Sequence, residues 1–453
     1  MPFLALSLTF SLSKTAAVVV AVILLASFDL SERLKHRESH VIFASILGTV
    51  LSLSILAIVR ALLQPGIQEN AHVMALGVLT IVLLWRCLFG PWAAQTKAVV
   101  LGTFLFWIGL YTFFHEPPEH RLIRILATIT AIIPAVIWCV LFLEYHRERL
   151  ASVVLMFFAG MVATIPILFY DALVRRGVEL QFFVVKLKPE SFNQSTEQFV
   201  SGQLIGITPL HSTILTVFLS FIIVGLIEEV SKYWVLRRNG EPFITSVDDM
   251  LQLSIMVAIG FSFAENITNP GYFMGFVREY LVFPDRPDII GFISNVVGRS
   301  VMTTMVHIVS TGVMGYFIGL AIFANPLLEE GYKQGRINQV VEWLHTILRV
   351  KRVPIFRTEM LIVGVVSAIV LHGLFNFLVT LPDILPGNPR TLGDLFGVPG
   401  HPILKYLAIL LLPALFYVVG GFWMLTGLFM NKENMKERGH LVQKEVFIKE
   451  AVA

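Results

Sequence analysis

Charged residues are scarce in this chain, and cysteines are scarcer still. Aspartate, glutamate, lysine and arginine make up 14% of its 453 residues, and hydrophobic residues make up 56%. A soluble protein of this length carries roughly a quarter charged residues. This composition excludes a soluble globular protein and predicts a polytopic membrane protein. Cys87 and Cys139 both lie in apolar runs, which argues against a disulfide framework and a cysteine-bound zinc site.

Several common signatures of catalysis and nucleotide binding are also missing. The chain has no Gly-rich phosphate loop, no His-Glu-x-x-His pair and no Gly-x-Ser-x-Gly elbow. Its formal net charge of +3 is too small to indicate nucleic-acid binding. We therefore expect no nucleic-acid partner, and a lipid bilayer as the surroundings of the chain.

Long apolar segments occupy most of the sequence. Because about 20 apolar residues cross the hydrocarbon core as a helix, we predict an all-α transmembrane helix bundle of about eleven spans. The stretch 270–299 is interrupted by Arg278 and Glu279, so we expect an interfacial or re-entrant segment there. The predicted spans are 4–28, 41–63, 72–90, 98–114, 122–143, 150–170, 212–235, 251–269, 300–323, 361–380 and 402–429.

Lysine and arginine are concentrated in connections that lie on one side of the predicted membrane. Even numbers of predicted spans separate these connections, which include Arg147 with Arg149 and Arg237 with Arg238. Since basic loops are cytoplasmic, we expect an integral protein of the plasma (inner) membrane with its N-terminus outside and its C-terminus in the cytoplasm. The loop 171–211, with a glycosylation pattern at Asn193-Gln-Ser195, is then external.

Two adjacent carboxylates, Glu228 and Glu229, lie inside a long apolar run. An ionised carboxylate in hydrocarbon costs several kcal/mol, so such residues normally face a protein interior or a wet cavity. Lys232 follows Glu228 by one helical turn and can pair with it, whereas Glu229 points about 100° away. One carboxylate is then held while the other is free to take a proton from water. The alternative is a charged cap at the membrane surface, beside Arg237 and Arg238.

Three further positions carry ionisable or amide groups at membrane depth. They are Glu265 with Asn266, His307, and His372 with Asn376 one turn later. Each alone fits a structural hydrogen bond between helices as well as it fits a functional role. In combination, His307, His372 and the carboxylate of Glu265 match the ligand set of a zinc ion with an open fourth position. Alternatively, histidine and asparagine donate hydrogen bonds to an oxyanion while a glutamate activates water.

Two other signals have structural explanations. Ser246 and Asp249 precede an apolar run with the spacing of a helix capping box. Arg299, near the start of the span that holds His307, either pairs with a carboxylate or marks the membrane interface.

As a set, these motifs resemble the PrsW family of intramembrane proteases, distant relatives of the CAAX prenyl endopeptidases and of a wider clan of bacterial membrane proteases. The resemblance covers about residues 212–380, and the order of the motifs is more specific than any one of them. One departure is Thr303, four residues before His307, where related motifs have an aromatic residue. The matching motifs are Glu228-Glu229-Val-Ser-Lys232, Phe261-Ser-Phe-Ala-Glu265-Asn266, His307 with its downstream glycines, and His372-Gly-Leu-Phe-Asn376.

The resemblance implies endoproteolysis of membrane-anchored proteins, with anti-sigma factors as the best-known type of substrate. It implies either one zinc ion or a metal-free glutamate mechanism. The residues that it implies are catalytic are Glu228, Glu229, Glu265, His307 and His372, and those that support them are Lys232, Asn266 and Asn376.

Our leading hypothesis is therefore an intramembrane endopeptidase. The first alternative is a proton-coupled secondary transporter whose buried glutamates and histidines relay protons, although the two halves show no matching Gly/Pro-broken segments. The second is a non-catalytic relative that binds membrane partners, against which the intact motifs count. We expect an N-terminal extension of about six helices at 1–170, an external loop at 171–211, a protease core at 212–380, and a last span with a basic cytoplasmic tail at 381–453.

Overall fold

The computed structural model describes residues 40–62, 92–175, 180–182, 185–187, 210–269, 271–282 and 288–437, with isolated positions between 77 and 90. The predicted span 4–28, most of the span 72–90 and the sequon at Asn193 lie outside the described residues. The chain divides into two compact units, residues 1–121 with 150–158, and residues 122–149 with 159–453. Each unit is described by itself.

The described residues are almost entirely helical, which confirms the all-α prediction. Their strands are Leu180–Phe182 (β1) and Val185–Leu187 (β2), an antiparallel pair in which Leu180 lies opposite Leu187. The predicted span 212–235 corresponds to helix α11 (Leu210–Val235), and the count of about eleven spans stays a prediction. Among the described residues, eight helices are long and apolar enough to cross a membrane: Phe43–Arg60, Ala94–His115, Pro118–Tyr145, Leu150–Tyr170, Val247–Thr268, Ile289–Ile322, Arg352–Ile384 and Leu411–Phe429.

The first unit contains α3 (His40–Leu62) and α5 (Ala94–His115), which pack against each other. Trp107 Nε1 donates a hydrogen bond to Thr49 Oγ1 at 2.9 Å. The helices approach closely at Gly48, where a Cβ atom would lie 2.6 Å from the carbonyl oxygen of Val100. Small residues at the contact are typical of helix packing in membranes.

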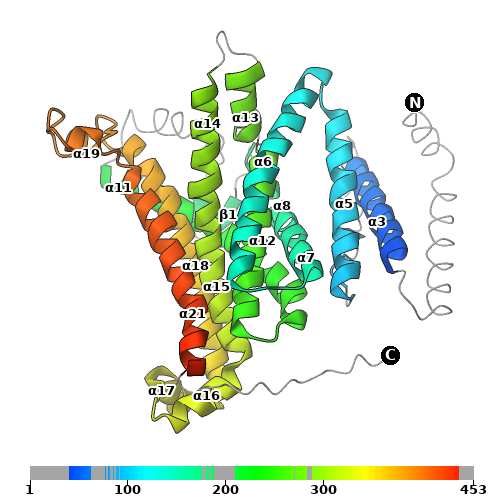
Figure 1. Cartoon of the computed structure of the whole chain (residues 1–453), viewed down its shortest axis with the longest axis vertical. Helices are drawn as coiled ribbons and strands as arrows, with labels where there is room; N and C mark the ends of the chain where they lie inside the picture. Colours follow the sequence, from blue (N-terminus) through cyan, green and yellow to red (C-terminus); the bar gives the residue numbers. More distant parts are fainter. Residues whose placement is uncertain are drawn as a thin grey trace. The chain divides into compact units, whose positions relative to one another are not determined.

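The second unit is built around α15 (Thr304–Ile322), which packs against α12 (Val247–Thr268) and α18 (Arg352–Ile384). Helix α11 packs on α18, and Figure 1 shows α12, α15 and α18 together in the bundle. Ser246 caps α12 as predicted, because its Oγ accepts a hydrogen bond from the backbone N–H of Asp249 at 3.1 Å. Further helices of this unit are α8 (Ile165–Arg175), α21 (Gly421–Glu437) and α6 (Pro118–Tyr145) from Leu122 onward, and α7 (Leu150–Val162) contributes to both units.

The described residues of the interrupted stretch 270–299 are mainly helical, in two segments that pack against each other. Helix α13 (Phe273–Val277) continues into a π-helical turn, Arg278–Val282, and α14 (Ile289–Gly298) returns beside it (Figure 1). A second π-helical turn, Arg299–Thr303, joins α14 to α15. The candidate span therefore starts at Ile289, well before the predicted boundary at residue 300.

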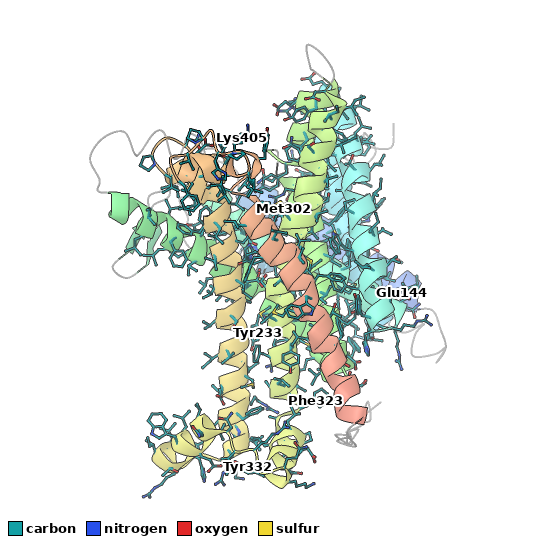
Figure 2. The ribbon with its side chains drawn as sticks, turned by 60° about the vertical axis from the view of Figure 1, so that its left-hand side comes forward. Glu144, Tyr233, Met302, Phe323, Tyr332 and Lys405 are labelled. Carbon is teal, nitrogen blue, oxygen red and sulfur yellow. The ribbon has the colours of Figure 1, made fainter. Side chains whose placement is uncertain are left out.

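Short helices lie at both ends of α18, near Tyr332 at one end and Lys405 at the other in Figure 2. At the first end, α16 (Ala324–Lys333) and α17 (Gln339–Leu348) precede α18. Arg352 fixes α17 through two bonds to the carboxylate of Glu342, at 2.6 and 2.9 Å. At the other end lie α19 (Leu392–Leu395) and α20 (Leu411–Ala414).

Two glycines bring α11 and α18 into direct backbone contact. A Cβ atom at Gly373 would lie 3.1 Å from the backbone nitrogen of Ile222, and one at Gly225 would lie 3.0 Å from the carbonyl oxygen of Ile369. The helices approach this closely because neither glycine has a side chain. The contact places Glu228, one turn after Gly225, close to the helix position of His372.

Candidate active site

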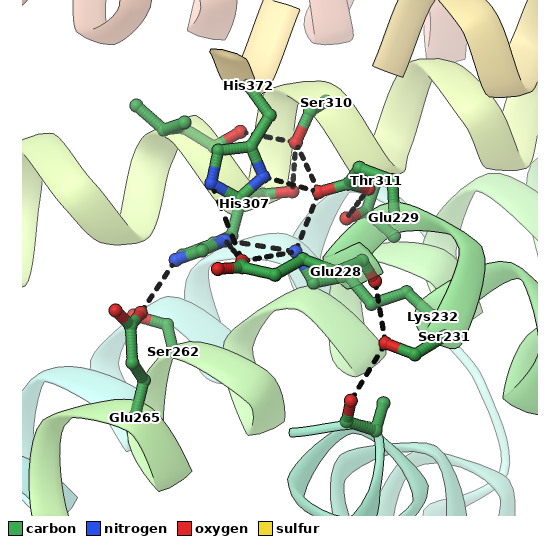
Figure 3. A network of polar contacts seen from close by, with 12 residues as sticks. Glu228, Glu229, Ser231, Lys232, Ser262, Glu265, His307, Ser310, Thr311 and His372 are labelled. Carbon is green, nitrogen blue, oxygen red and sulfur yellow. Dashed lines mark hydrogen bonds and ion pairs between the residues drawn. The ribbon is translucent and has the colours of Figure 1, made fainter. Parts of the chain in front are cut away.

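Buried polar side chains from four helices of the second unit form one connected network (Figure 3). Every residue predicted as catalytic is in it, and Glu229, Lys232, His307 and His372 are at most 2% exposed. The contributors are Glu228, Glu229 and Lys232 from α11, Glu265 from α12, His307, Ser310 and Thr311 from α15, and His372 from α18.

Glu229 lies at the centre of this network and is fully buried. Its Oε1 accepts hydrogen bonds from Lys232 Nζ at 2.7 Å, His372 Nδ1 at 2.8 Å and Ser310 Oγ at 3.2 Å. Its Oε2 accepts one from Thr311 Oγ1 at 3.0 Å. A carboxylate with this many donors is satisfied as an anion and has little capacity left for water.

Lys232 is a fully buried cation between three helices. Its Nζ is 2.7 Å from Glu229 Oε1 and 3.8 Å from Glu228 Oε2, so the closer partner is Glu229 rather than the residue one full turn away. On a helix, residues three apart and residues four apart are both neighbours on one face. The sequence predicted the pair that is four apart, Glu228 with Lys232. Nζ also lies 3.0 Å from His307 Nδ1 and 4.0 Å from the ring centroid of Phe261. The aromatic ring favours the charge without an additional ion pair.

His307 and His372 each have one ring nitrogen against a carboxylate. His307 Nε2 is 3.0 Å from Glu265 Oε2, and His372 Nδ1 is 2.8 Å from Glu229 Oε1. A carboxylate accepts the N–H of a neutral imidazole, which leaves the other nitrogen with its lone pair. The centroids of the two rings are 4.8 Å apart, and the angle between the ring planes is 84°. Their other nitrogens, His307 Nδ1 and His372 Nε2, lie on the side of Glu228, and His307 Nδ1 also faces Lys232 Nζ.

Glu228 differs from its neighbour in having an oxygen without a donor. Oε2 is buried and makes no hydrogen bond to the described residues. It is 3.5 Å from His372 Nε2 and 3.9 Å from His307 Nδ1, and the three ligand atoms all lie within 4.8 Å of one another. Two imidazoles and a carboxylate form a donor set that suits a zinc-like ion, and each imidazole has the carboxylate partner that metal-bound histidines usually have.

Glu265 lies on the far side of His307 from this group. One oxygen faces His307 Nε2 and the other is 2.7 Å from a terminal nitrogen of Arg299. The sequence proposed Glu265 as the carboxylate ligand, whereas the structure places Glu228 in the group that could hold a metal.

The two predicted asparagines lie next to the network rather than within it. Asn266 Oδ1 accepts a hydrogen bond from Arg299 Nε at 2.8 Å. Asn376 is half-buried on α18, one turn after His372, and its side chain makes no hydrogen bond to the described residues. Sequence reasoning did not include Ser310 and Thr311 in the site, although both follow His307 by about one helical turn and so share its face.

A family model described as PrsW family intramembrane metalloprotease matches residues 148–400. The chain belongs to the PrsW family. The match includes all four helices of the network, and it extends beyond the range 212–380 that the motifs cover. No curated protein and no solved structure matches the chain.

Membership of the PrsW family makes this protein an integral membrane peptidase whose substrates are membrane proteins within the bilayer. It decides against the proton-coupled transporter that the sequence alone left open. The buried Glu228, His307 and His372 agree with the metalloprotease description of the family.

Proposed function

We propose that this PrsW protein cleaves peptide bonds of membrane-anchored proteins, with Glu228 as the carboxylate that activates water. The Oε2 atom of Glu228, which makes no hydrogen bond to the described residues and is directed at two histidines, carries this proposal. Glu229 is fully hydrogen-bonded, and Glu265 is held between Arg299 and His307. Of the three carboxylates, Glu228 therefore has the greatest capacity to accept a proton.

The chemistry assigned to Glu228 is general acid–base catalysis. Its carboxylate removes a proton from water as the water oxygen attacks the peptide carbonyl carbon. The proton then passes to the amide nitrogen as the C–N bond breaks, which gives a carboxylate and an amine. Glu229 holds His372, and Glu265 holds His307, so that both rings keep the orientation seen in Figure 3.

The donor set fits a divalent ion, and zinc is the ion we propose. His307 Nδ1, His372 Nε2 and Glu228 would hold it, with Glu265 behind His307 instead of in the ligand set. A bound zinc ion polarises a carbonyl and lowers the pKa of water. A carboxylate has two oxygens, so Glu228 can bind an ion through one and accept a proton on the other.

The position of Lys232 supports a second, metal-free mechanism. Its Nζ is 3.0 Å from His307 Nδ1, the nitrogen that an ion would need. Metal binding there requires Lys232 to give up this hydrogen bond. Without a metal, Lys232 supplies the positive charge of the site. Asn376, together with His372 once its Nε2 has gained a proton, would donate hydrogen bonds to the oxyanion.

The substrates we propose are proteins anchored by a transmembrane helix, of which anti-sigma factors are the type that the family resemblance suggests. Three of the four helices that carry the buried network, α12, α15 and α18, have the length and composition of membrane spans, which favours a bond close to the bilayer as the site of cleavage. The predicted inner-membrane location and orientation of the termini agree with such substrates.

Cleavage of a single-span reporter in proteoliposomes tests the role of Glu228. We expect Glu228→Gln to lower kcat by about 10²–10⁴-fold with an unchanged unfolding temperature. Glu329→Gln, which changes an exposed carboxylate on α16, is the matched control and should retain activity. Undiminished turnover in Glu228→Gln would refute the proposal.

Metal analysis of the purified protein separates the two mechanisms. One ion per chain, lost in His307→Ala and His372→Ala, supports the zinc mechanism. Full activity in a strong chelator, with no bound metal, supports the mechanism based on Lys232.

A further inference from the structure

Arg299 is a half-buried arginine that contacts three side chains next to the site. A terminal nitrogen is 2.7 Å from Glu265 Oε1, and Nε donates to Asn266 Oδ1 at 2.8 Å. The guanidinium carbon lies 3.3 Å from the ring centroid of Tyr272. Its planar group is therefore held by an ion pair, by a hydrogen bond and by an aromatic ring on one face, which is an arrangement that arginine can make and lysine cannot.

The contact with Glu265 connects Arg299 to the site. Glu265 uses one oxygen for Arg299 and the other for His307 Nε2. This bond to His307 keeps the proton on Nε2 and leaves Nδ1 on the side of Glu228. Glu265 is 19% exposed by side chain, so without Arg299 it could rotate toward solvent and release His307.

A local change in helix geometry aligns Arg299 with His307. Eight residues of a regular α-helix turn about 80° beyond two full turns, so the two side chains would point in different directions. The turn Arg299–Thr303 is π-helical and contains an additional residue. The eight positions from Arg299 to His307 then rotate about the helix axis by about as much as seven positions of an α-helix. This rotation returns Arg299 to nearly the same face as His307.

We propose that Arg299 is a positioning residue of the peptidase, which acts through Glu265 to hold His307 with Nδ1 facing Glu228. This inference rests on the proposed function. It also assigns a role to Asn266, which follows Glu265 in the sequence and accepts a hydrogen bond from the same guanidinium. The simpler role as a membrane-interface anchor predicts no effect on His307.

Kinetics of Arg299→Gln and Arg299→Lys in proteoliposomes test the proposal. We expect Arg299→Gln to lower kcat by about 10–100-fold with KM within about twofold, since outer partners of a catalytic histidine have effects of this size. Arg299→Lys should recover part of the loss, because it restores a positive charge opposite Glu265 without the hydrogen bond to Asn266. Arg278→Gln is the matched control, since Arg278 lies in the nearby π-helical turn and its buried Nε has no partner among the described residues.

A double-mutant cycle with Glu265→Gln distinguishes positioning from general stability. If Arg299 acts through Glu265, then Arg299→Gln adds little to the loss already caused by Glu265→Gln. Zinc affinity, measured by competition with a chromogenic chelator, should follow the same non-additive pattern if the site binds metal. Additive losses in the cycle, or a kcat equal to that of Arg278→Gln, would overturn the proposal.

A milder variant covers the case in which Arg299→Gln does not fold. Asn266→Ala removes one hydrogen bond of the guanidinium and keeps the ion pair, so we expect a drop in kcat of about two- to fivefold. No drop would count against the proposal. If Glu228→Gln is inactive and the Arg299 variants are fully active, the role of Arg299 is refuted and the proposed function stands. If Glu228→Gln is active, the proposed function itself is refuted.

Discussion

Helices α12 and α6 belong to the same unit and both can span a membrane, but their surroundings differ. In the most apolar stretch of α12, 89% of the residues are buried, against 22% in α6. The buried helix carries Gln252, Ser254 and Ser262 as well as Glu265, whereas the exposed side chains of α6 are mainly isoleucine and valine. Lipid is as apolar as those side chains, so hydrophobicity alone does not bring helices together in a membrane. Polar and small residues therefore mark the interior helices.

The largest effect on stability should come from removing the buried cation. Lys232→Met leaves Glu229 charged in the interior without its closest partner, which should cost about 3–5 kcal/mol. Unfolding of the detergent-solubilised protein by titration with SDS measures this loss of stability. Lys405→Met, at an exposed lysine, should stay within about 0.5 kcal/mol. Equal effects of the two changes would contradict the contrast between interior and surface.

A matched pair of isoleucines compares α12 and α6 directly. Ile255 on α12 is fully buried and Ile133 on α6 is 57% exposed. Ile255→Ala should destabilise by about 2–5 kcal/mol because it opens a cavity. Ile133→Ala should change the free energy of unfolding, measured by the same SDS titration, by less than about 0.5 kcal/mol. A cost for Ile133→Ala close to that of Ile255→Ala would show that α6 is covered by protein.

Replacing each of two glycines by alanine should change the stability of the protein in opposite directions. A Cβ atom at Gly315 on α15 would lie 3.0 Å from the carbonyl oxygen of Met250 and even closer to Ser254, so we expect a loss of about 1–3 kcal/mol. Gly427 on α21 has nothing within 4 Å of that position. There alanine should stabilise the helix by about 0.5–1 kcal/mol. Thermal unfolding of the two variants in the same detergent measures both signs.

The smallest predicted effect is a pH dependence at the junction of α6 and α12. His146 Nε2, just after α6, is 2.7 Å from Asp249 Oδ1 and 3.6 Å from Glu148 Oε1. The hydrogen bond with Asp249, and then the nearby carboxylate of Glu148, raises the pKa of His146 to about 9. A histidine in the unfolded chain has a pKa of about 6.5. The stabilisation that protonated His146 contributes is therefore complete below that pH and is lost as the pH rises through about 9.

Thermal unfolding across this pH range checks the prediction. The unfolding temperature of the unchanged protein should fall between about pH 6.5 and 9, and that of His146→Gln should fall less. Parallel curves for both proteins would show that His146 does not contribute.

The sequence located the ionisable groups of the network on their helices, because a membrane span is visible in local composition and a charged residue within it stands out. It could not separate the roles of Glu228 and Glu229. Spacing on one helix allows Lys232 to reach either carboxylate, and only the neighbouring Ser310, Thr311 and His372 satisfy Glu229. These partners come from other helices, whose rotation the sequence does not specify.

Arg299 shows a second limit of sequence reasoning. Its spacing from His307 indicates different faces on a regular helix, and the π-helical turn between them removes this difference. The division of the chain at residues 170, 211 and 380 and the direction of insertion stay predictions.

The sequence by itself determined a helical membrane protein, the order of its motifs and the residue types of its candidate site. These properties are local, since they depend on composition and on the period of a helix. Only the tertiary structure decided that Glu228 keeps an oxygen without a hydrogen bond to the described residues, that Glu229 is satisfied and that Glu265 lies between His307 and Arg299. Those contacts depend on the rotation and depth of four helices, which are set by close packing at positions such as Gly225 and Gly373.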